Sequence, residues 1–288
     1  MNTTKTLFSI IVPTYNRPEK LAQCLQSFVE LEYPRDKFQV IVVNDSTEIS
    51  VENTISPFQN GLNLTLLTQP NSGPATARNT GAFAAEGKFL VFTDDDCTVA
   101  AIGGRTVNAL PDNIYSTASQ QLIDYLYSYY NAIGDRAQFF TSNNFALPAE
   151  AFQKIGGFDT TFSLAAGEDR EFCFRWLNLG GRAVYAPEVT VYHSHALTLR
   201  KFWRQQFNYG RGAFLFGEII SKSGAKGKRQ HPSFYLNLLT YPFSQGSGIQ
   251  KLLIAALFLV SQAGIAAGLF WEKNVFVEKE FVDRGRQF

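Results

Sequence analysis

The first third of the chain alternates short apolar runs with stretches of helical periodicity. The apolar runs are Leu7–Val12, Phe38–Val43, Leu62–Leu67 and Phe89–Phe92. Polar residues, glycine or proline bound each run, so we predict a strand at each one. Between them, apolar residues recur at helical spacing over 21–29, and Ala75–Ala85 is rich in alanine, which predicts two helices. Strands that alternate with helices predict an α/β fold with a mostly parallel sheet.

The middle of the chain is less regular. Tyrosines and leucines at helical spacing predict a helix over Tyr115–Ile133, and Phe139–Leu147 is expected to form a strand. Apolar residues on one face predict a second helix over Glu168–Leu179, which the following glycine pair ends. Arg182–His193 is expected to form one or two strands.

The composition changes in the last third of the chain. Residues 200–231 hold eight Lys or Arg and one acid, with aromatic residues between them, and Leu252–Trp271 then runs for 20 residues without a charge. We therefore predict three parts: a catalytic α/β domain over 1–198, a basic and aromatic helical segment over 199–248, and an apolar helix with a short tail over 249–288.

The uncharged run suits a membrane. A helix of 20 residues is about 30 Å long, which matches the hydrocarbon core of a bilayer. Lys251 and Lys273 bracket the run, and Trp271 lies where an interfacial aromatic residue is expected. With the basic segment beside it, we expect membrane association and a catalytic body on the cytoplasmic face. The run is interrupted by Ser261, Gln262, Gly264 and Gly268. A helix that packs on protein is therefore the alternative, and spanning and peripheral binding both stay open.

The net charge of +1 hides a division along the chain. Residues 1–199 hold 13 Lys or Arg against 20 Asp or Glu, whereas residues 200–288 hold 13 against 5. The acidic body argues against a nucleic-acid partner, which is the other use of a basic patch. Three widely spaced cysteines form neither a disulfide framework nor a zinc site, so a reducing compartment is expected. The first apolar run is too short for a signal peptide, and none is expected.

Three consecutive carboxylates, Asp94, Asp95 and Asp96, follow the predicted strand Phe89–Phe92. Such a cluster is unfavourable without a cation, and hard oxygen ligands suit Mg²⁺ or Mn²⁺. Alternation along an extended chain points Asp94 and Asp96 to the same side. A solvated acidic loop is the alternative.

Other polar clusters also follow predicted strands, where ligands bind in open α/β sheets. Asp45 either contacts a nucleotide or caps a turn. The stretch Asn71–Asn79 opens a helix whose first amides, with Arg78, suit a phosphate, but it is neither a P-loop nor a dinucleotide fingerprint.

Two more pairs of residues carry candidate chemistry. Glu168 and Asp169 begin a predicted helix, where they either stabilise its first turn or supply a general base. His193 and His195 follow a predicted strand and either ligate a metal or have no special role.

The order of these motifs resembles that of the family 2 glycosyltransferases of the GT-A fold, over roughly residues 7–195. The motifs are Ser9–Arg17, Val40–Asp45, Asn71–Asn79, Phe92–Asp96 and Gly167–Asp169. The resemblance implies a Rossmann-like sheet with helices on both faces and an inverting transfer from a nucleotide-diphosphate sugar, a UDP- or GDP-sugar, with Mg²⁺ or Mn²⁺. The implied acceptor is a carbohydrate or lipid-linked hydroxyl of the kind used in cell-envelope polysaccharide biosynthesis.

Roles are expected as follows. Asp169 is the general base, with Glu168 beside it. The metal ligands are Asp96, Asp94 and His193. The nucleotide sugar is contacted by Pro13, Thr14, Tyr15, Arg17, Asp45, Arg78, Asp94 and Asp95. The acceptor is bordered by Asn143, Asn144 and Trp176.

Two departures from the family pattern support a second hypothesis. Asn44-Asp45 supplies one carboxylate where relatives have a pair, and the chain passes from Asp96 to Gly104 without the helix that relatives insert there. The second hypothesis is a catalytically weakened or inactive relative that binds sugar nucleotides as an assembly subunit. A nucleotidyltransferase is disfavoured because the glycine- and lysine-rich N-terminal loop of those enzymes is absent from the sequence.

Overall fold

The computed structural model describes residues 6–95, 97–99, 104–133, 136–224, 230–245 and 248–285, and their side chains except at 97–99 and 279–285. In chain order the elements are β1 (Phe8–Thr14), α1 (Pro18–Val29), the 3₁₀ helix η1 (Arg35–Lys37), β2 (Phe38–Asn44), α2 (Glu52–Ile55), η2 (Ser56–Phe58), β3 (Leu64–Thr68), α3 (Pro74–Phe83), β4 (Phe89–Phe92), β5 (Cys97–Val99), β6 (Gly104–Asn108), α4 (Ile114–Tyr130), β7 (Phe145–Pro148), α5 (Ala149–Ile155), α6 (Glu168–Asn178), β8 (Ala186–His193), α7 (Leu199–Lys222), α8 (Pro232–Gln245) and α9 (Gln250–Gly285). They form two compact units, one made of Met1–Ala109 with Tyr129–His195 and one made of Leu110–Ser128 with Ala196–Phe288.

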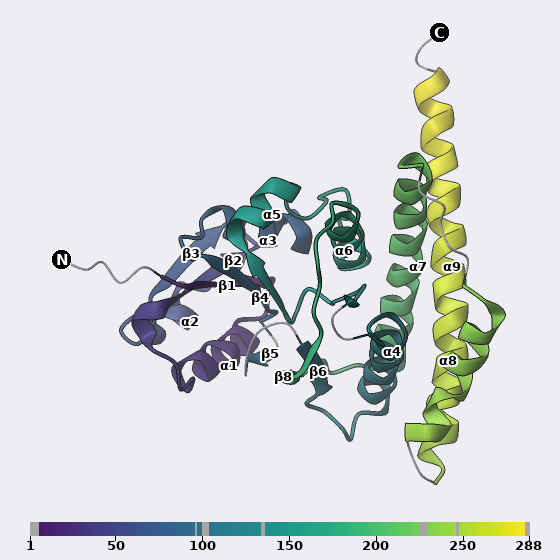
Figure 1. Ribbon diagram of the computed structural model, residues 1–288, viewed down its shortest axis with the longest axis horizontal. Helices are drawn as coiled ribbons and strands as arrows, with labels where there is room; N and C mark the ends of the chain where they lie inside the picture. Colours follow the sequence, from purple (N-terminus) through teal and green to yellow (C-terminus); the bar gives the residue numbers. More distant parts are fainter. Residues whose placement is uncertain are drawn as a thin grey trace. The chain divides into compact units, whose positions relative to one another are not determined.

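The first unit is built on a five-stranded sheet in the order β3-β2-β1-β4-β7, in which β7 is antiparallel to its neighbour (Figure 1). Both faces of the sheet are covered, so its strands read as continuous apolar runs. On one face, Leu25 and Phe28 of α1 belong to the same buried cluster as Val40 of β2. On the other face, Ala77 of α3 packs with Ile41. The predicted mostly parallel sheet with helices on both faces is confirmed.

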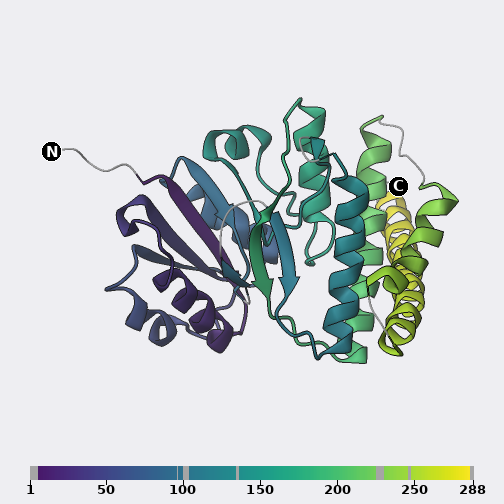
Figure 2. The same cartoon turned by 60° about the horizontal axis from the view of Figure 1, so that its bottom comes forward.

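A second, three-stranded sheet lies in the same unit (Figure 2). Its central strand β8 runs antiparallel to β5 and parallel to β6. Cys97 pairs with His193, so the chain that follows the acidic triplet runs beside the end of β8.

The strand predicted over Phe139–Leu147 is wrong for its first part, because β7 begins only at Phe145. The side chain of Asn131 explains the difference. Its Oδ1 accepts hydrogen bonds from the amides of Gln138 and Phe139, at 3.0 and 3.1 Å, and its Nδ2 donates to the Phe139 carbonyl at 2.7 Å. The backbone here is satisfied by a side chain instead of a strand ladder.

Five phenylalanines pack together behind the ends of the strands. Phe92 of β4 lies 5.3–5.4 Å, between ring centroids, from the rings of Phe145, Phe152 and Phe158. Phe172 of α6 lies 4.9 Å from Phe158. This cluster fixes α6 and the turn around Phe158 against β4.

The second unit is helical. Leu122 of α4, Phe202 of α7, Phe234 of α8 and Phe258 of α9 share one buried cluster.

The apolar helix predicted from the sequence is present and longer than expected, since α9 begins at Gln250 and ends at Gly285. Within the described residues, its segment Gln250–Glu278 is long and apolar enough to cross a membrane, by length and composition alone. The predicted boundaries at residues 198 and 248 stay predictions.

Candidate active site

The ends of three neighbouring strands bring the predicted donor residues together in the first unit. β1 ends at Thr14, β2 is followed by Asp45, and β4 is followed by Asp94 and Asp95. The amide of Asp45 donates to the carbonyl of Thr14 at 2.9 Å, which extends the ladder between β1 and β2 to this edge. Parallel strands end at the same edge of a sheet, so the polar clusters that follow them lie close together.

Arg78 connects two of these clusters. It lies on α3 and is almost completely buried, at 3% exposure. Its Nη2 lies 3.0 Å from Oδ1 of Asp94, and its Nη1 lies 3.0 Å from Oε1 of Glu168 on α6. The guanidinium therefore joins the acid that follows β4 to the acid that begins α6.

Glu168 and Asp169 form the first turn of α6, which the left-handed Gly167, with φ of 98°, leads into. Burial, together with the neighbouring charge of Asp169, raises the pKa of Glu168 to about 7, and Arg78 opposes both effects. Burial also raises the pKa of Asp169. The amide of Arg170, which donates a hydrogen bond to Oδ1 at 2.7 Å, partly opposes this rise. A carboxyl pair with raised pKa values, in which Glu168 is buried and Asp169 half-buried, is an environment suited to a general base.

Two buried polar atoms of this group have no hydrogen-bond partner among the described residues. They are Oε2 of Glu168 and Nε of Arg78. Buried polar groups in native proteins are generally paired, so these atoms mark a place where a ligand or a proton is expected.

Asp95 points away from this group, into the protein. It is fully buried, its Oδ2 accepts from Oγ1 of Thr14 at 2.6 Å, and its Oδ1 lies 2.8 Å from Nη2 of Arg17. Asp95 thus positions the end of β1 and the loop that follows it. Pro13, within β1, is buried, and Tyr15, in the loop, is 45% exposed.

Asp45 holds the turn ahead of α3. Its carboxylate accepts from Nε2 of Gln69 at 2.8 Å and from the amides of Ser72 and Gly73 at 2.8 and 2.9 Å. Gly73 has φ of 86°, and an added Cβ would lie 2.8 Å from the carbonyl oxygen of Ser163. The geometry is that of the capping alternative, and a nucleotide contact by Asp45 stays a prediction.

A divalent metal is expected beside Asp94. This side chain is 25% exposed at the strand end, whereas Asp96 lies outside the described residues. The ring of His193 lies 5.3 Å from that of His195, and its role as a ligand stays a prediction. No group of three or more His, Cys, Asp or Glu suited to a metal occurs in the part of the chain that the structure describes. Mg²⁺ is usually held by one or two carboxylates and the substrate's phosphates, so the partly exposed Asp94 fits such a site.

The predicted acceptor residues fall in two places. Asn143 accepts from Oγ1 of Thr141 at 2.7 Å, and Asn144 donates to the carbonyl of Arg105 at 3.0 Å. Both follow Ser142, whose backbone interacts with the carboxylate of Asp169. Trp176 lies about two turns further along α6, where its Nε1 donates to the carbonyl of Arg182 at 3.1 Å. The structure therefore brings the segment 142–144 to Asp169, and it does not bring Trp176 there.

Asn79 is a residue whose part in the site was not predicted. Its Nδ2 donates to the carbonyl of Phe158 and its Oδ1 accepts from the amide of Phe158, both at 2.8 Å. An added Cβ on Gly157 would lie 2.7 Å from that Oδ1. Asn79 is the residue after Arg78 on α3, and it fixes the turn that contains Gly157 and Phe158. The polar Asn79 directly after Arg78 was the available signal, but no spacing links it to a turn almost eighty residues later.

Comparison with known proteins identifies the family of the chain. The family model described as glycosyl transferase family 2 matches residues 9–102, and that of glycosyl transferase family group 2 matches residues 89–276. The second match covers well over half of the chain, which therefore belongs to the family 2 glycosyltransferases.

Individual relatives are distant. The probable glycosyltransferase YdaM of Bacillus subtilis is 25% identical over 234 residues, which cover 71% of this chain and 54% of YdaM. Glycosyltransferase AglE of Haloferax volcanii is 24% identical over 229 residues, which cover 74% of each chain. The chain thus spans about half of the first relative and three quarters of the second.

One solved structure supports the fold over most of the chain. The mannosyltransferase PcManGT of Pyrobaculum calidifontis, in complex with GDP-Man and Mn²⁺, has a TM-score of 0.62 and 22% identity. The alignment covers 92% of this chain and 86% of that chain. The predicted GT-A fold is therefore confirmed.

Proposed function

We propose that this protein is an inverting glycosyltransferase that transfers a sugar from a UDP- or GDP-sugar to a hydroxyl of a lipid-linked or polysaccharide acceptor. The observation that carries the proposal is the bridge through Arg78, which connects a carboxylate suited to a metal-bound diphosphate with a carboxyl pair suited to a base. A structural relative that binds GDP-Man and Mn²⁺ supports the donor class and the metal.

On the donor side, Asp94 and Asp96 would hold Mg²⁺ or Mn²⁺ together with the diphosphate. Such an ion neutralises charge on the departing diphosphate when it is bound. The buried guanidinium of Arg78 adds a second positive charge beside Asp94, and the loop that Asp95 holds through Thr14 and Arg17 borders the nucleotide.

On the acceptor side, Asp169 is the general base. It takes the proton of the acceptor hydroxyl as that oxygen forms a bond to the anomeric carbon and the bond from this carbon to the diphosphate breaks. Attack opposite the leaving group inverts the anomeric configuration. Glu168 positions Arg78 and, with its pKa raised to about 7, accepts a proton readily at neutral pH.

The second unit supports a membrane-linked acceptor. Its helix α9 is long and apolar, and the basic residues of α7 suit an anionic surface. Positive charges favour the cytoplasmic side of a membrane, so the proposed location is its cytoplasmic face.

The test is to incubate the full chain with UDP- and GDP-sugars, Mn²⁺ and extracted acceptor lipids or polysaccharide. We expect nucleotide release that is coupled to product formation. NMR of the product should show that the anomeric configuration is inverted relative to the donor. Asp169→Asn should bind donor and lose transfer. Glu150→Gln, which changes an exposed carboxyl on α5, should bind donor and keep transfer. Donor binding without transfer in every acceptor mixture would contradict the proposal and favour an inactive assembly subunit.

A further inference from the structure

One face of α9 is both apolar and exposed over five turns. Its exposed residues recur every three or four positions, which places them on a single stripe. The stripe consists of Leu252, Ala256, Leu259, Ala263, Ala266 and Phe270. The larger members are more than half exposed, with Leu259 at 59% and Phe270 at 64%. A continuous apolar face of this length is unusual on a protein surface and marks an interaction site.

The opposite face of α9 packs closely on α7, beside which it runs in the same direction (Figure 1). A Cβ added to Gly268 would lie 1.9 Å from the carbonyl oxygen of Phe207. A Cβ added to Gly210 would lie 2.0 Å from the carbonyl oxygen of Ile265. Only glycine permits backbones to approach this closely. We therefore treat α7 and α9 as one tightly packed pair, so that any position of α9 in a membrane also places α7.

The register of the pair places charge beside the middle of the apolar run. Gln206 accepts a hydrogen bond from Ser261 at 2.8 Å, and Arg211 forms an ion pair with Glu272. Arg204, two residues before Gln206, is therefore level with the centre of Leu252–Trp271. Arg204 is exposed, as are Arg200 and Lys201 one turn earlier.

This register argues against a helix that crosses the bilayer. If α9 spanned the membrane, Arg204 would enter the centre of the hydrocarbon together with α7. Arg200 and Lys201 would follow within one turn. Exposed charges at that depth are strongly unfavourable.

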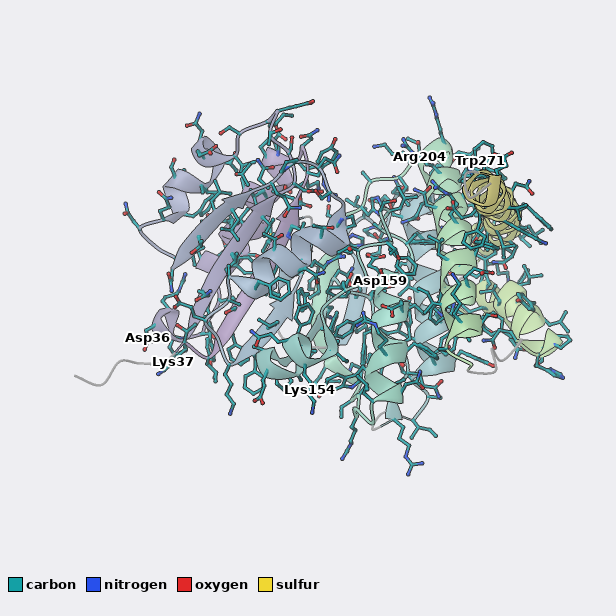
Figure 3. The ribbon with its side chains drawn as sticks, turned by 90° about the horizontal axis from the view of Figure 1, so that it is seen from above. Asp36, Lys37, Lys154, Asp159, Arg204 and Trp271 are labelled. Carbon is teal, nitrogen blue, oxygen red and sulfur yellow. The ribbon has the colours of Figure 1, made fainter. Side chains whose placement is uncertain are left out.

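We propose that α9 lies along the surface of an anionic bilayer, with its apolar stripe among the acyl chains and α7 at the level of the lipid phosphates. A helix in this position is immersed by about 5–10 Å, and α7 packs closely on the side opposite the stripe. In this position the basic side chains of α7 contact the lipid phosphates. Figure 3 shows Arg204 on α7 and Trp271 on α9. Trp271 lies 6.3 Å from Phe207, one turn after Arg204. The proposal deepens the membrane placement given above and does not depend on glycosyl transfer.

Vesicle binding tests the stripe and the charges separately. The full chain should float with phosphatidylcholine vesicles that contain phosphatidylglycerol. Leu259→Glu, at an exposed position, should weaken binding at least about tenfold. Arg204→Gln should weaken it about fivefold and reduce its salt dependence. Gln59→Glu adds the same charge to an exposed site on the first unit and should change nothing. Equal flotation of Leu259→Glu and the wild type would overturn the proposal. It would also be overturned if the wild type does not bind vesicles and instead forms a dimer that Leu259→Glu dissociates.

Labelling of both ends of α9 distinguishes lying along the membrane from crossing it. Lys251→Cys and Lys273→Cys are made singly, and inverted membrane vesicles from the producing cells are treated with an impermeant maleimide. Both variants should react before permeabilisation, above the background of the wild type. Reaction of one variant only after permeabilisation would show a spanning helix and overturn the proposal. Donor binding measured on the same preparations separates a failure of this placement from a failure of the proposed activity.

Discussion

Replacement of Glu168 by glutamine should change how the stability of the first unit depends on pH. Glu168 is 3% exposed, and burial raises its pKa from 4.5 to about 7. The folded protein therefore keeps a proton on Glu168 over a range in which the unfolded chain has lost it. Glutamine has the same shape, can still accept from Arg78 and does not ionise.

The sign and size of the effect follow from this difference. Between about pH 4.5 and pH 7 the folded state binds more protons at Glu168, so the free energy of unfolding of the wild type falls as the pH rises. The gap between the two pKa values corresponds to about 3 kcal/mol. Glu168→Gln does not titrate at this position, so its free energy of unfolding should not fall in this way. Relative to the wild type, the variant should become more stable between pH 5 and pH 8, by up to about 3 kcal/mol.

Urea unfolding followed by circular dichroism, at a series of pH values, measures the difference. Glu150→Gln is the matched control, because it makes the same change at an exposed carboxyl of α5, and its curve should follow that of the wild type. Parallel curves for Glu168→Gln and the wild type across the whole range would refute a buried, titrating Glu168.

Three further substitutions test other parts of the structure. Asp45→Ala leaves the amides of Ser72 and Gly73 without their acceptor and should cost about 1–3 kcal/mol of unfolding free energy in urea titrations. Asn79→Ala removes both hydrogen bonds to Phe158 and should cost a similar amount and weaken donor binding, measured by calorimetry. Gly268→Ala forces α7 and α9 apart and should lower the melting temperature, whereas Gly217→Ala, with nothing within 4 Å of its added Cβ, should leave it unchanged or raise it.

The strand ends and their acids were predictable because they depend on local patterns. Apolar runs followed by Asp45 and by Asp94 fix which residues meet at one edge of a parallel sheet. Alternation also separates Asp94 from Asp95, and the structure turns Asp95 inward.

The remaining features depend on contacts between distant segments. The bridge from Arg78 to Glu168 joins residues 90 positions apart, and no spacing encodes it. The backbone before β7 is held by Asn131, which interrupts the expected strand. Gly264 and Gly268 were recognised only as interruptions of an apolar run, whereas the structure shows them as the contact surface of α9 with α7.

The central claim is that a metal-dependent nucleotide-sugar site lies at the strand ends, and ligand-dependent thermal stability tests it most directly. Melting temperatures of the wild type and of Asp96→Asn are compared with UDP- and GDP-sugars, with and without Mn²⁺. A ligand at 100 times its Kd stabilises the folded state by about 2.7 kcal/mol. We expect a rise with at least one nucleotide sugar in the wild type that requires Mn²⁺ and is lost in Asp96→Asn. No rise with any nucleotide sugar, or an equal rise without metal and in Asp96→Asn, would contradict the claim.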